Sequence, residues 1–274
     1  MDVLEITVLE LDDFKARFIV RGVNVAFINA LRRIMIAEVP CMAIDEVAII
    51  ENSSVLYDEI LAHRLAMIPL KTPKDGYVMS KECKCGGAGC SLCQARLYLD
   101  VKWEGEGAKT VYSGDLKPED PEVAPVYDNI PIVKLSQGQS IVLEAYATLG
   151  LGKDHAKWQP TSACAYKYMP VIAVDLSLCD GCGACVESCP KGLLKLSEGS
   201  VKVSNVVDCT LCRECERVCE KGALKVGWDE STFVFLVEST GTLKVSDIVL
   251  KAVHVLRAKA EEFNFQLSKM TGGG

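Results

Sequence analysis

The sequence of 274 residues has no run of about 18 apolar residues, which excludes a membrane-spanning helix. It also has no excess of basic charge, because 37 acidic residues outnumber 30 basic ones and the formal net charge is −7. A free-standing nucleic-acid-binding protein normally carries a basic face. Any role near DNA or RNA must therefore come through partner proteins or through a small local patch.

Motifs of several common enzyme classes are missing as well. No GxGxxG follows a predicted strand, and residues 150–153 (GLGK) lack both the first glycine and the Ser/Thr of a P-loop. The three histidines, His63, His155 and His254, are scattered, and none stands in a nucleophile signature. No carboxylate pattern indicates a two-metal site. We therefore expect no catalytic residues in this chain.

Cysteine, by contrast, is plentiful and clustered. Of 14 cysteines, four lie between Cys83 and Cys93 and eight between Cys179 and Cys219. The other two, Cys41 and Cys164, stand alone and are expected to be small buried hydrophobic residues. No basic segment precedes an apolar stretch at the N-terminus, so we expect a cytoplasmic chain without a secretory signal. In such a chain, clustered cysteines indicate metal binding rather than disulfide bonds.

The eight later cysteines form an internal repeat with an offset of 30 residues. DLSLCDGCGACVESCPKGLLKL, which starts at Asp175, aligns with NVVDCTLCRECERVCEKGALKV, which starts at Asn205. Each copy reads C-x₂-C-x₂-C-x₃-C. The first three cysteines can wrap a tight loop around one face of a cubane cluster. We expect a short helix after this loop, and this helix would carry the fourth cysteine away from that cluster. In two-cluster ferredoxins that fourth cysteine serves the other cluster. The pattern predicts two [4Fe–4S] clusters, with ligands Cys179, Cys182, Cys185 and Cys219 for the first and Cys209, Cys212, Cys215 and Cys189 for the second.

This segment resembles bacterial-type ferredoxins over about 55 residues. The second copy departs from the pattern, since Glu220 replaces the proline after Cys219 and Thr210-Leu211 replace Asp-Gly. Loss of one iron, giving a [3Fe–4S] form, therefore stays open there. Electron transfer is one possible role. A structural or regulatory role is the other, because metal–thiolate bonds can hold a small domain together and 8 acidic against 7 basic residues in 171–228 provide no strong steering field.

The smaller cluster reads C-x-C-x₄-C-x₂-C. Its cysteines are Cys83, Cys85, Cys90 and Cys93, and the glycines between them let the loop fold back. Four thiolates so close in sequence can close a tetrahedron around zinc, and they leave no open position for catalysis. A structural zinc site is one interpretation, and four free thiols are the alternative.

The two ends of the chain have similar patterns. Alternating apolar residues predict strands over residues 3–9, 14–20 and 232–238, and Asn24 can cap a helix that ends near Glu38. A long helix is predicted over residues 246–269. Its apolar side chains recur with a period of 3.5 residues, which is typical of helix-on-helix packing: Val249, Val253, Leu256, Ala260, Phe263 and Leu267. Packing within the chain and packing against a partner both fit this seam.

We expect an α+β protein in three parts. Residues 1–41 and 229–274 form one discontinuous domain. Residues 42–170 contain short strand-like runs separated by Pro and Gly, which predicts a mostly-β insertion that carries the Cys83–Cys93 loop. Residues 171–228 form a ferredoxin-like insertion.

Three segments resemble the α-like subunits of multisubunit RNA polymerases. They are VNVAFINALRRIMIAEVPCMAIDEVAI (Val23–Ile49), GLGKDHAKWQPTSACAYKYMP (Gly150–Pro170) and the long C-terminal helix. Together with the ferredoxin-like insertion, they make the chain similar to the archaeal α-like (D-type) polymerase subunits, counterparts of the third-largest subunit of the eukaryotic enzyme. The resemblance covers essentially the whole chain and implies that the discontinuous domain is an α-like dimerisation domain. The eukaryotic relative binds zinc at a place similar to Cys83–Cys93, which favours zinc here.

This resemblance implies a scaffold role within a DNA-dependent RNA polymerase, a nucleotidyltransferase whose catalytic residues lie in other subunits. A subunit of this family pairs with the small subunit L, and the pair then recruits subunits N and P and the large catalytic subunits, so DNA is met only through the complex. The implied interface residues are Phe27, Leu31, Arg32, Arg33, Met35, Val249, Val253, Leu256, Ala260 and Phe263. Arg32 and Arg33 are candidates for contact with a large subunit, or else belong to a solvated helix face. The alternative function is an iron–sulfur electron-transfer subunit of an unrelated oxidoreductase complex.

Overall fold

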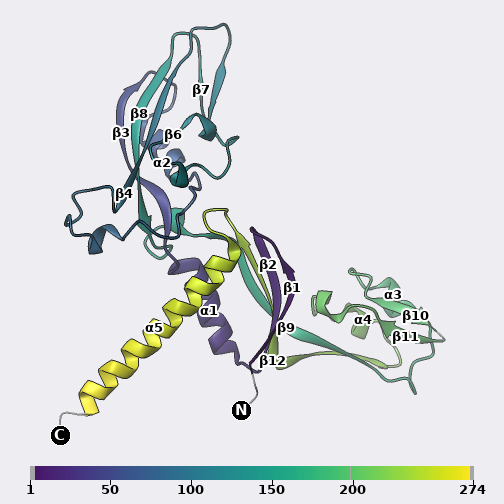
Figure 1. Cartoon of the computed structure of the whole chain (residues 1–274). Coiled ribbons are helices and arrows are strands. Elements are labelled where there is room, and N and C mark those ends of the chain that lie inside the picture. Colours follow the sequence, from purple (N-terminus) through teal and green to yellow (C-terminus); the bar gives the residue numbers. More distant parts are fainter. Residues whose placement is uncertain (1–3, 198, 272–274) are drawn as a thin grey trace. The chain divides into compact units, whose positions relative to one another are not determined.

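The computed structural model describes residues 4–197 and 199–271 (Figure 1). The chain divides into two compact units. Unit 1 contains Arg17–Asn29, Ala165–Leu236 and the described part of Met1–Glu10. Unit 2 contains Leu11–Ala16, Ala30–Cys164 and the described residues from Val237 onward. Strands outnumber helices in the described residues, which confirms the predicted α+β class.

One sheet has the strand order β1-β2-β12-β9. Its strands are β1 (Glu5–Leu11), β2 (Lys15–Arg21), β12 (Leu224–Ser239) and β9 (Thr161–Val174). The predicted turn between β1 and β2 is closed by Asp12, whose Oδ1 accepts hydrogen bonds from the backbone N–H groups of Phe14 and Lys15, both at 2.7 Å. In unit 1, Phe18 stacks on Phe235 with ring centroids 5.3 Å apart.

Two strands of this sheet are longer than the sequence indicated. β9 continues through Pro170 to Val174, and β12 begins at Leu224 rather than near residue 232. Both strands therefore cross the predicted boundaries of the ferredoxin-like insertion. The backbone N–H of Asp175 donates to the carbonyl of Ala223 at 2.7 Å, which ties the two strands together where the repeat begins and ends. The three-domain division remains a prediction.

The cysteine repeat in unit 1 is built from short elements. They are α3 (Ala184–Glu187), β10 (Leu194–Ser197), β11 (Ser200–Val203) and α4 (Glu214–Arg217), and β10 pairs with β11 in an antiparallel hairpin. Its small core includes two cysteines among aliphatic side chains: Cys185, Leu194, Val201, Cys215, Leu224 and Val226. The expectation that each short helix carries the fourth cysteine needs correction. α3 contains Cys185 and α4 contains Cys215, which are the third cysteines of the two copies. Both helices end before the fourth cysteine of their copy.

Unit 2 contains most of the chain's buried side chains. A sheet of order β3-β8-β4-β6 joins β3 (Cys41–Asn52), β8 (Ser140–Gly150), β4 (Gln94–Lys102) and β6 (Lys117–Pro118). β5 (Lys109–Tyr112) pairs with β7 (Pro131–Leu135), and the helix α2 (Asp58–Ala66) buries Leu61 and Leu65 in the same core. In β4 every second residue is buried, as the alternation of QARLYLDVK requires. Short 3₁₀ turns occupy Ser80–Glu82, Ser113–Asp115, Pro121–Val123, Ala156–Trp158 and, in unit 1, Val206–Asp208.

Two longer helices complete the chain. α1 (Val25–Ala37) is capped as predicted, because Oδ1 of Asn24 accepts a hydrogen bond from the N–H of Phe27 at 2.9 Å. α5 (Val245–Thr271) is buried at Val245, Ile248 and Ala252 in its first two turns and is exposed from Arg257 to Met270. Among the described residues, no helix combines the length and apolar character needed to cross a bilayer.

Candidate metal centres

The four cysteines of the 83–93 loop converge. All four sulfur atoms lie within 4.8 Å of one another, and the closest Sγ pairs are Cys83–Cys90 at 3.6 Å, Cys85–Cys93 at 3.6 Å and Cys90–Cys93 at 3.8 Å. A Zn–S distance of about 2.3 Å places the sulfur atoms of a tetrahedral site about 3.8 Å apart. The loop is therefore already shaped for a four-thiolate zinc ion. Gly86, with φ of 67°, is one of the left-handed residues that fold it back.

The thiols of this loop differ in acidity. Hydrogen bonds from the Cys83 thiol and the Gly87 backbone lower the pKa of Cys85 to about 6. Burial raises the pKa of Cys93 to about 12. A thiol that is already deprotonated near neutral pH gives a metal ion its first ligand, because thiolates rather than thiols bind metals.

The eight cysteines of the repeat line two separate pockets in unit 1. The first pocket has a volume of about 250 Å³, and four cysteines line it. We call these four the first site: Cys179, Cys182, Cys185 and Cys219. The second pocket, about 10 Å³, is lined by the second site: Cys189, Cys209, Cys212 and Cys215. These are the two sets that the ferredoxin pattern predicts, each with its fourth cysteine from the other copy. All 14 cysteines of the chain are free thiols.

The two pockets differ in how readily a cubane would fit. The first has room for one as it stands. The second is much smaller and is close to the smallest space that holds a water molecule. Two backbone N–H groups point at sulfur atoms of the second site, Leu193 to Cys189 at 3.5 Å and Leu211 to Cys209 at 3.4 Å. Such hydrogen bonds tune iron–sulfur clusters.

The pKa shifts also group the eight cysteines into the first and second sites. Burial raises the pKa of Cys215 to about 11, and the facing charges of the other three second-site cysteines add to that rise. Burial also raises the pKa of Cys185, with contributions from the other three first-site cysteines. Thiolates packed this closely repel one another, and cationic iron relieves that repulsion.

The second copy keeps the backbone path of the first without its glycines. Gly181 and Gly183 have φ values of 72° and 82° in the first copy. Leu211 and Arg213, at the equivalent positions, have φ values of 59° and 60°. A left-handed conformation costs a non-glycine residue about 1–2 kcal/mol. The departure from the ferredoxin pattern thus changes the residues but not the loop.

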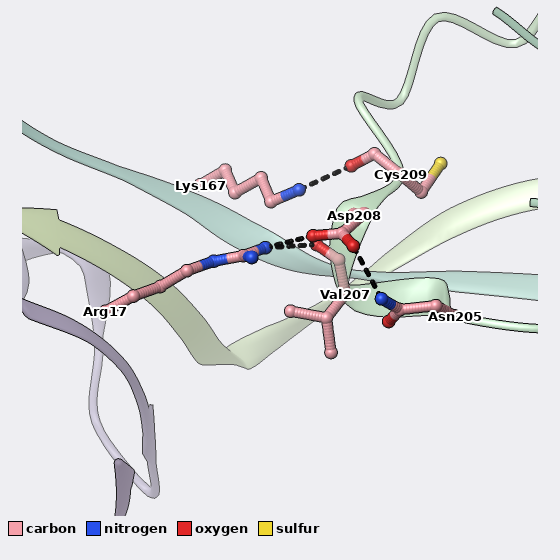
Figure 2. Close-up of polar contacts among 6 residues, drawn as sticks. All are labelled: Arg17, Lys167, Asn205, Val207, Asp208 and Cys209. Carbon is pink, nitrogen blue, oxygen red and sulfur yellow. Dashed lines mark hydrogen bonds and ion pairs between the residues drawn. The ribbon is translucent and has the colours of Figure 1, made fainter. Parts of the chain in front are cut away.

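Two contacts of the second site were not predicted from the sequence (Figure 2). Arg17 on β2 forms an ion pair with Asp208, directly before Cys209, and also donates to the carbonyl of Val207 at 3.4 Å. Nζ of Lys167 on β9 donates to the carbonyl of Cys209 at 2.6 Å. The sequence contained one signal for these contacts. Asp208 is charged, whereas Leu178, the residue at the same position of the first copy, is apolar.

Comparison with known proteins identifies the family. The model of the RNA polymerase Rpb3/RpoA insert domain matches residues 45–176, and that of the 4Fe-4S dicluster domain matches residues 178–228. DNA-directed RNA polymerase subunit Rpo3 of Archaeoglobus fulgidus is 48% identical over 260 residues, 95% of this chain and 96% of the relative. Rpo3 of Methanosarcina acetivorans is 46% identical (94% and 96% covered) and that of Pyrococcus furiosus 40% identical (98% and 98%). The chain belongs to the Rpo3 family. The resemblance stated from the sequence is thereby confirmed.

Within this Rpo3-family chain, the residues predicted for a subunit interface differ in accessibility. Leu31 and Met35 are only 5% and 0% exposed, because they lie on the face of α1 that the chain itself covers together with Ile28. Their predicted place in a partner interface stays a prediction, and the exposed members of the set are the more accessible ones. The exposed members are Phe27, Arg33, Val253, Ala260 and Phe263, and the half-buried ones are Arg32, Val249 and Leu256.

Proposed function

We propose that this chain is a noncatalytic assembly subunit of an archaeal DNA-directed RNA polymerase, acting in the cytoplasm. The observation that carries the proposal is identity of 40–48% with Rpo3 subunits over at least 94% of both chains. The chain meets DNA only through the assembled enzyme, which agrees with its net charge of −7.

The proposed first partner is the small subunit L, bound through α1 and α5. Support comes from the exposed apolar side chains of α5: Val253 is 43% exposed, Phe263 64% and Phe265 53%. Large apolar side chains exposed along one helix mark a protein–protein contact. Subunits N and P and the large catalytic subunits then join the pair.

The proposed cofactors are two [4Fe–4S] clusters and one structural zinc ion. The first and second sites would hold the clusters, and the 83–93 loop would hold the zinc. The sulfur separations near 3.6–3.8 Å support zinc. In unit 1 the third cysteines, Cys185 and Cys215, belong to the small core, so iron bound there stabilises the fold of the repeat. We propose that the clusters support assembly, or regulate it through their redox state.

The decisive experiment is anaerobic co-expression with an L-type subunit, followed by size-exclusion chromatography and iron and zinc analysis. We expect a stable heterodimer that contains zinc and the iron of two clusters. The variant Cys182→Ser/Cys212→Ser should still form the heterodimer but lose binding to the large subunits. Absence of a heterodimer would contradict the polymerase proposal. An iron-bearing chain that transfers electrons to a partner protein and forms no heterodimer would instead support the electron-transfer alternative.

A further inference from the structure

The segment that leads into the second site is held by residues outside the cysteine repeat. Arg17 reaches it from β2, and Lys167 reaches it from β9 (Figure 2). Both side chains and the whole segment from Asn205 to Cys209 belong to unit 1. The ion pair is half-buried, since the side chains of Arg17 and Asp208 are 28% and 38% exposed. Dissolved salt screens a half-buried ion pair less than a fully exposed one.

The segment is also braced from within. Nδ2 of Asn205 donates to Oδ2 of Asp208 at 2.5 Å, while the other carboxylate oxygen faces Arg17. Asp208 is therefore fixed from two sides, and its backbone continues directly into the first cysteine of the second site. The ammonium group of Lys167 fixes the carbonyl of that same cysteine.

The first site has a different support. Leu178 stands where Asp208 stands in the second copy, and it is 49% exposed. The side chain of Asp175, the counterpart of Asn205, accepts from the N–H of Ser177 at 2.9 Å and from its hydroxyl at 2.6 Å, and its backbone N–H donates to the carbonyl of Ala223 within the second copy. The approach to the first site is thus held by contacts inside the repeat.

We propose that Arg17 and Lys167 are positioning residues for the second iron–sulfur site, and that they couple its iron loading to strands β2 and β9. This inference rests on the proposed function, in which the eight cysteines hold two clusters. Lys167 holds the carbonyl of Cys209, and Arg17 holds the Val207 carbonyl and the Asp208 carboxylate directly before it. Because coupling between two sites is reciprocal, iron at the second site in turn steadies the two strands. Among the described residues, we find no comparable contact from an Arg or Lys side chain of β2 or β9 to the segment that leads into the first site.

The electrostatic setting favours the same pairing. A filled site brings four thiolates together, and its net charge is negative. Lys191 and Arg213 line the second pocket, and Arg17 and Lys167 contact the segment that leads into it, whereas Asp180, Glu220 and Lys221 line the first pocket. A cationic neighbour stabilises the more reduced, more negative state of a cluster. We therefore expect the second site to have the higher reduction potential of the two in the parent heterodimer.

The test uses Arg17→Gln and Asp208→Asn in the anaerobically prepared L heterodimer. Each variant should retain about half of the iron of the parent protein, and electron paramagnetic resonance of the reduced protein should change from an interacting two-cluster signal to that of one isolated cluster. Arg17→Lys, which keeps the charge, should restore iron and signal. Hydrogen exchange in residues 15–21 and 161–174 should be faster in Arg17→Gln than in the parent.

The matched control is Arg21→Gln. Arg21 lies on the same strand, but its partners are Glu5 at 3.5 Å and Thr7 at 3.0 Å, away from the cysteine repeat. It should keep full iron and the parent signal. Full iron in Arg17→Gln and Asp208→Asn, or equal loss from both sites, would overturn the inference and leave the proposed function intact. A parent heterodimer without two clusters would overturn both the inference and the two-cluster part of the proposed function.

Discussion

Gly181 and Leu211 occupy equivalent positions in the two copies of the repeat, yet their surroundings differ. A Cβ atom at Gly181 would come within 2.6 Å of the carbonyl oxygen of Gly199, which is closer than real Cβ contacts. Leu211 carries a full side chain at φ of 59° and packs against the core of the repeat. The first copy therefore needs its glycine for space as well as for conformation, whereas the second needs only the conformation.

At this scale we predict that Gly181→Ala damages the first site selectively. The clash with the Gly199 carbonyl should displace the loop between Cys179 and Cys182 and destabilise the repeat by about 1–3 kcal/mol. Iron content should fall by about half, with the signal of the second cluster retained. Leu211→Ala is the matched control, since it keeps a Cβ at the equivalent place. Equal iron in the two variants would contradict this explanation.

Among the elements, α5 has two halves with different roles. Its first turns are buried at Val245, Ile248 and Ala252, and its later turns are exposed although they carry Phe263 and Phe265. Side-chain periodicity in the sequence indicated one continuous seam, and it placed the helix within two residues of its observed ends. Periodicity cannot tell which stretch of a seam is covered by the same chain. A family resemblance has the same limit, since it places Leu31 and Met35 of α1 at the interface while the chain itself buries both side chains.

For this element we predict that Phe263→Asp weakens the heterodimer with L at least tenfold. A charge in place of a large apolar side chain removes its burial and leaves an unpaired carboxylate in the contact. Dissociation constants from analytical ultracentrifugation would measure the effect. The control is Ala258→Asp, which places the same charge on another face of the exposed half of α5. Equal weakening by both variants would point to helix destabilisation, and no weakening would remove Phe263 from the interface.

At the scale of the whole molecule, the stability of the chain is unevenly distributed. Unit 2 has a core of fully buried aliphatic side chains such as Leu97, Leu99 and Ile141. The cysteine repeat has a core of a few aliphatic residues and two cysteines. Small domains of this kind depend on metal–ligand bonds for their stability. We therefore expect loss of iron to unfold the cysteine repeat and to leave the aliphatic core of unit 2 folded.

We predict that iron removal by a chelator in air produces partial unfolding. Protease cleavage should appear between Asp175 and Ala223 while the segment 45–164 stays resistant, since the aliphatic core there needs no iron. Limited proteolysis with mass spectrometry, before and after iron removal, measures this. The zinc-free, iron-loaded protein serves as the control and should stay protected in the repeat. Cleavage spread evenly over the chain would contradict separate stabilities.

The sequence predicted the parts of this molecule whose signals are local. Cysteine spacing predicted which four cysteines line each of the two pockets and which four meet in the 83–93 loop, and Asn24 indicated the start of α1. Contacts between residues far apart in sequence were not accessible in this way. Arg17 and Asp208 are separated by 191 positions, and nothing in the alternation of β2 distinguishes Arg17 from any other charged residue on a strand. The extension of β9 through Pro170 was missed for a related reason, because proline usually ends or borders a strand.

The hydrogen bond from Asp175 to Ala223 has a consequence for the history of the fold. The last residue of β9 and the first of β12 are already neighbours, so everything between them is topologically the loop of one long hairpin. Replacing that loop by a tight turn would leave the pairing of the two strands intact. Insertion, loss of cysteines or deletion of the whole segment between β9 and β12 during evolution is therefore compatible with an unchanged sheet.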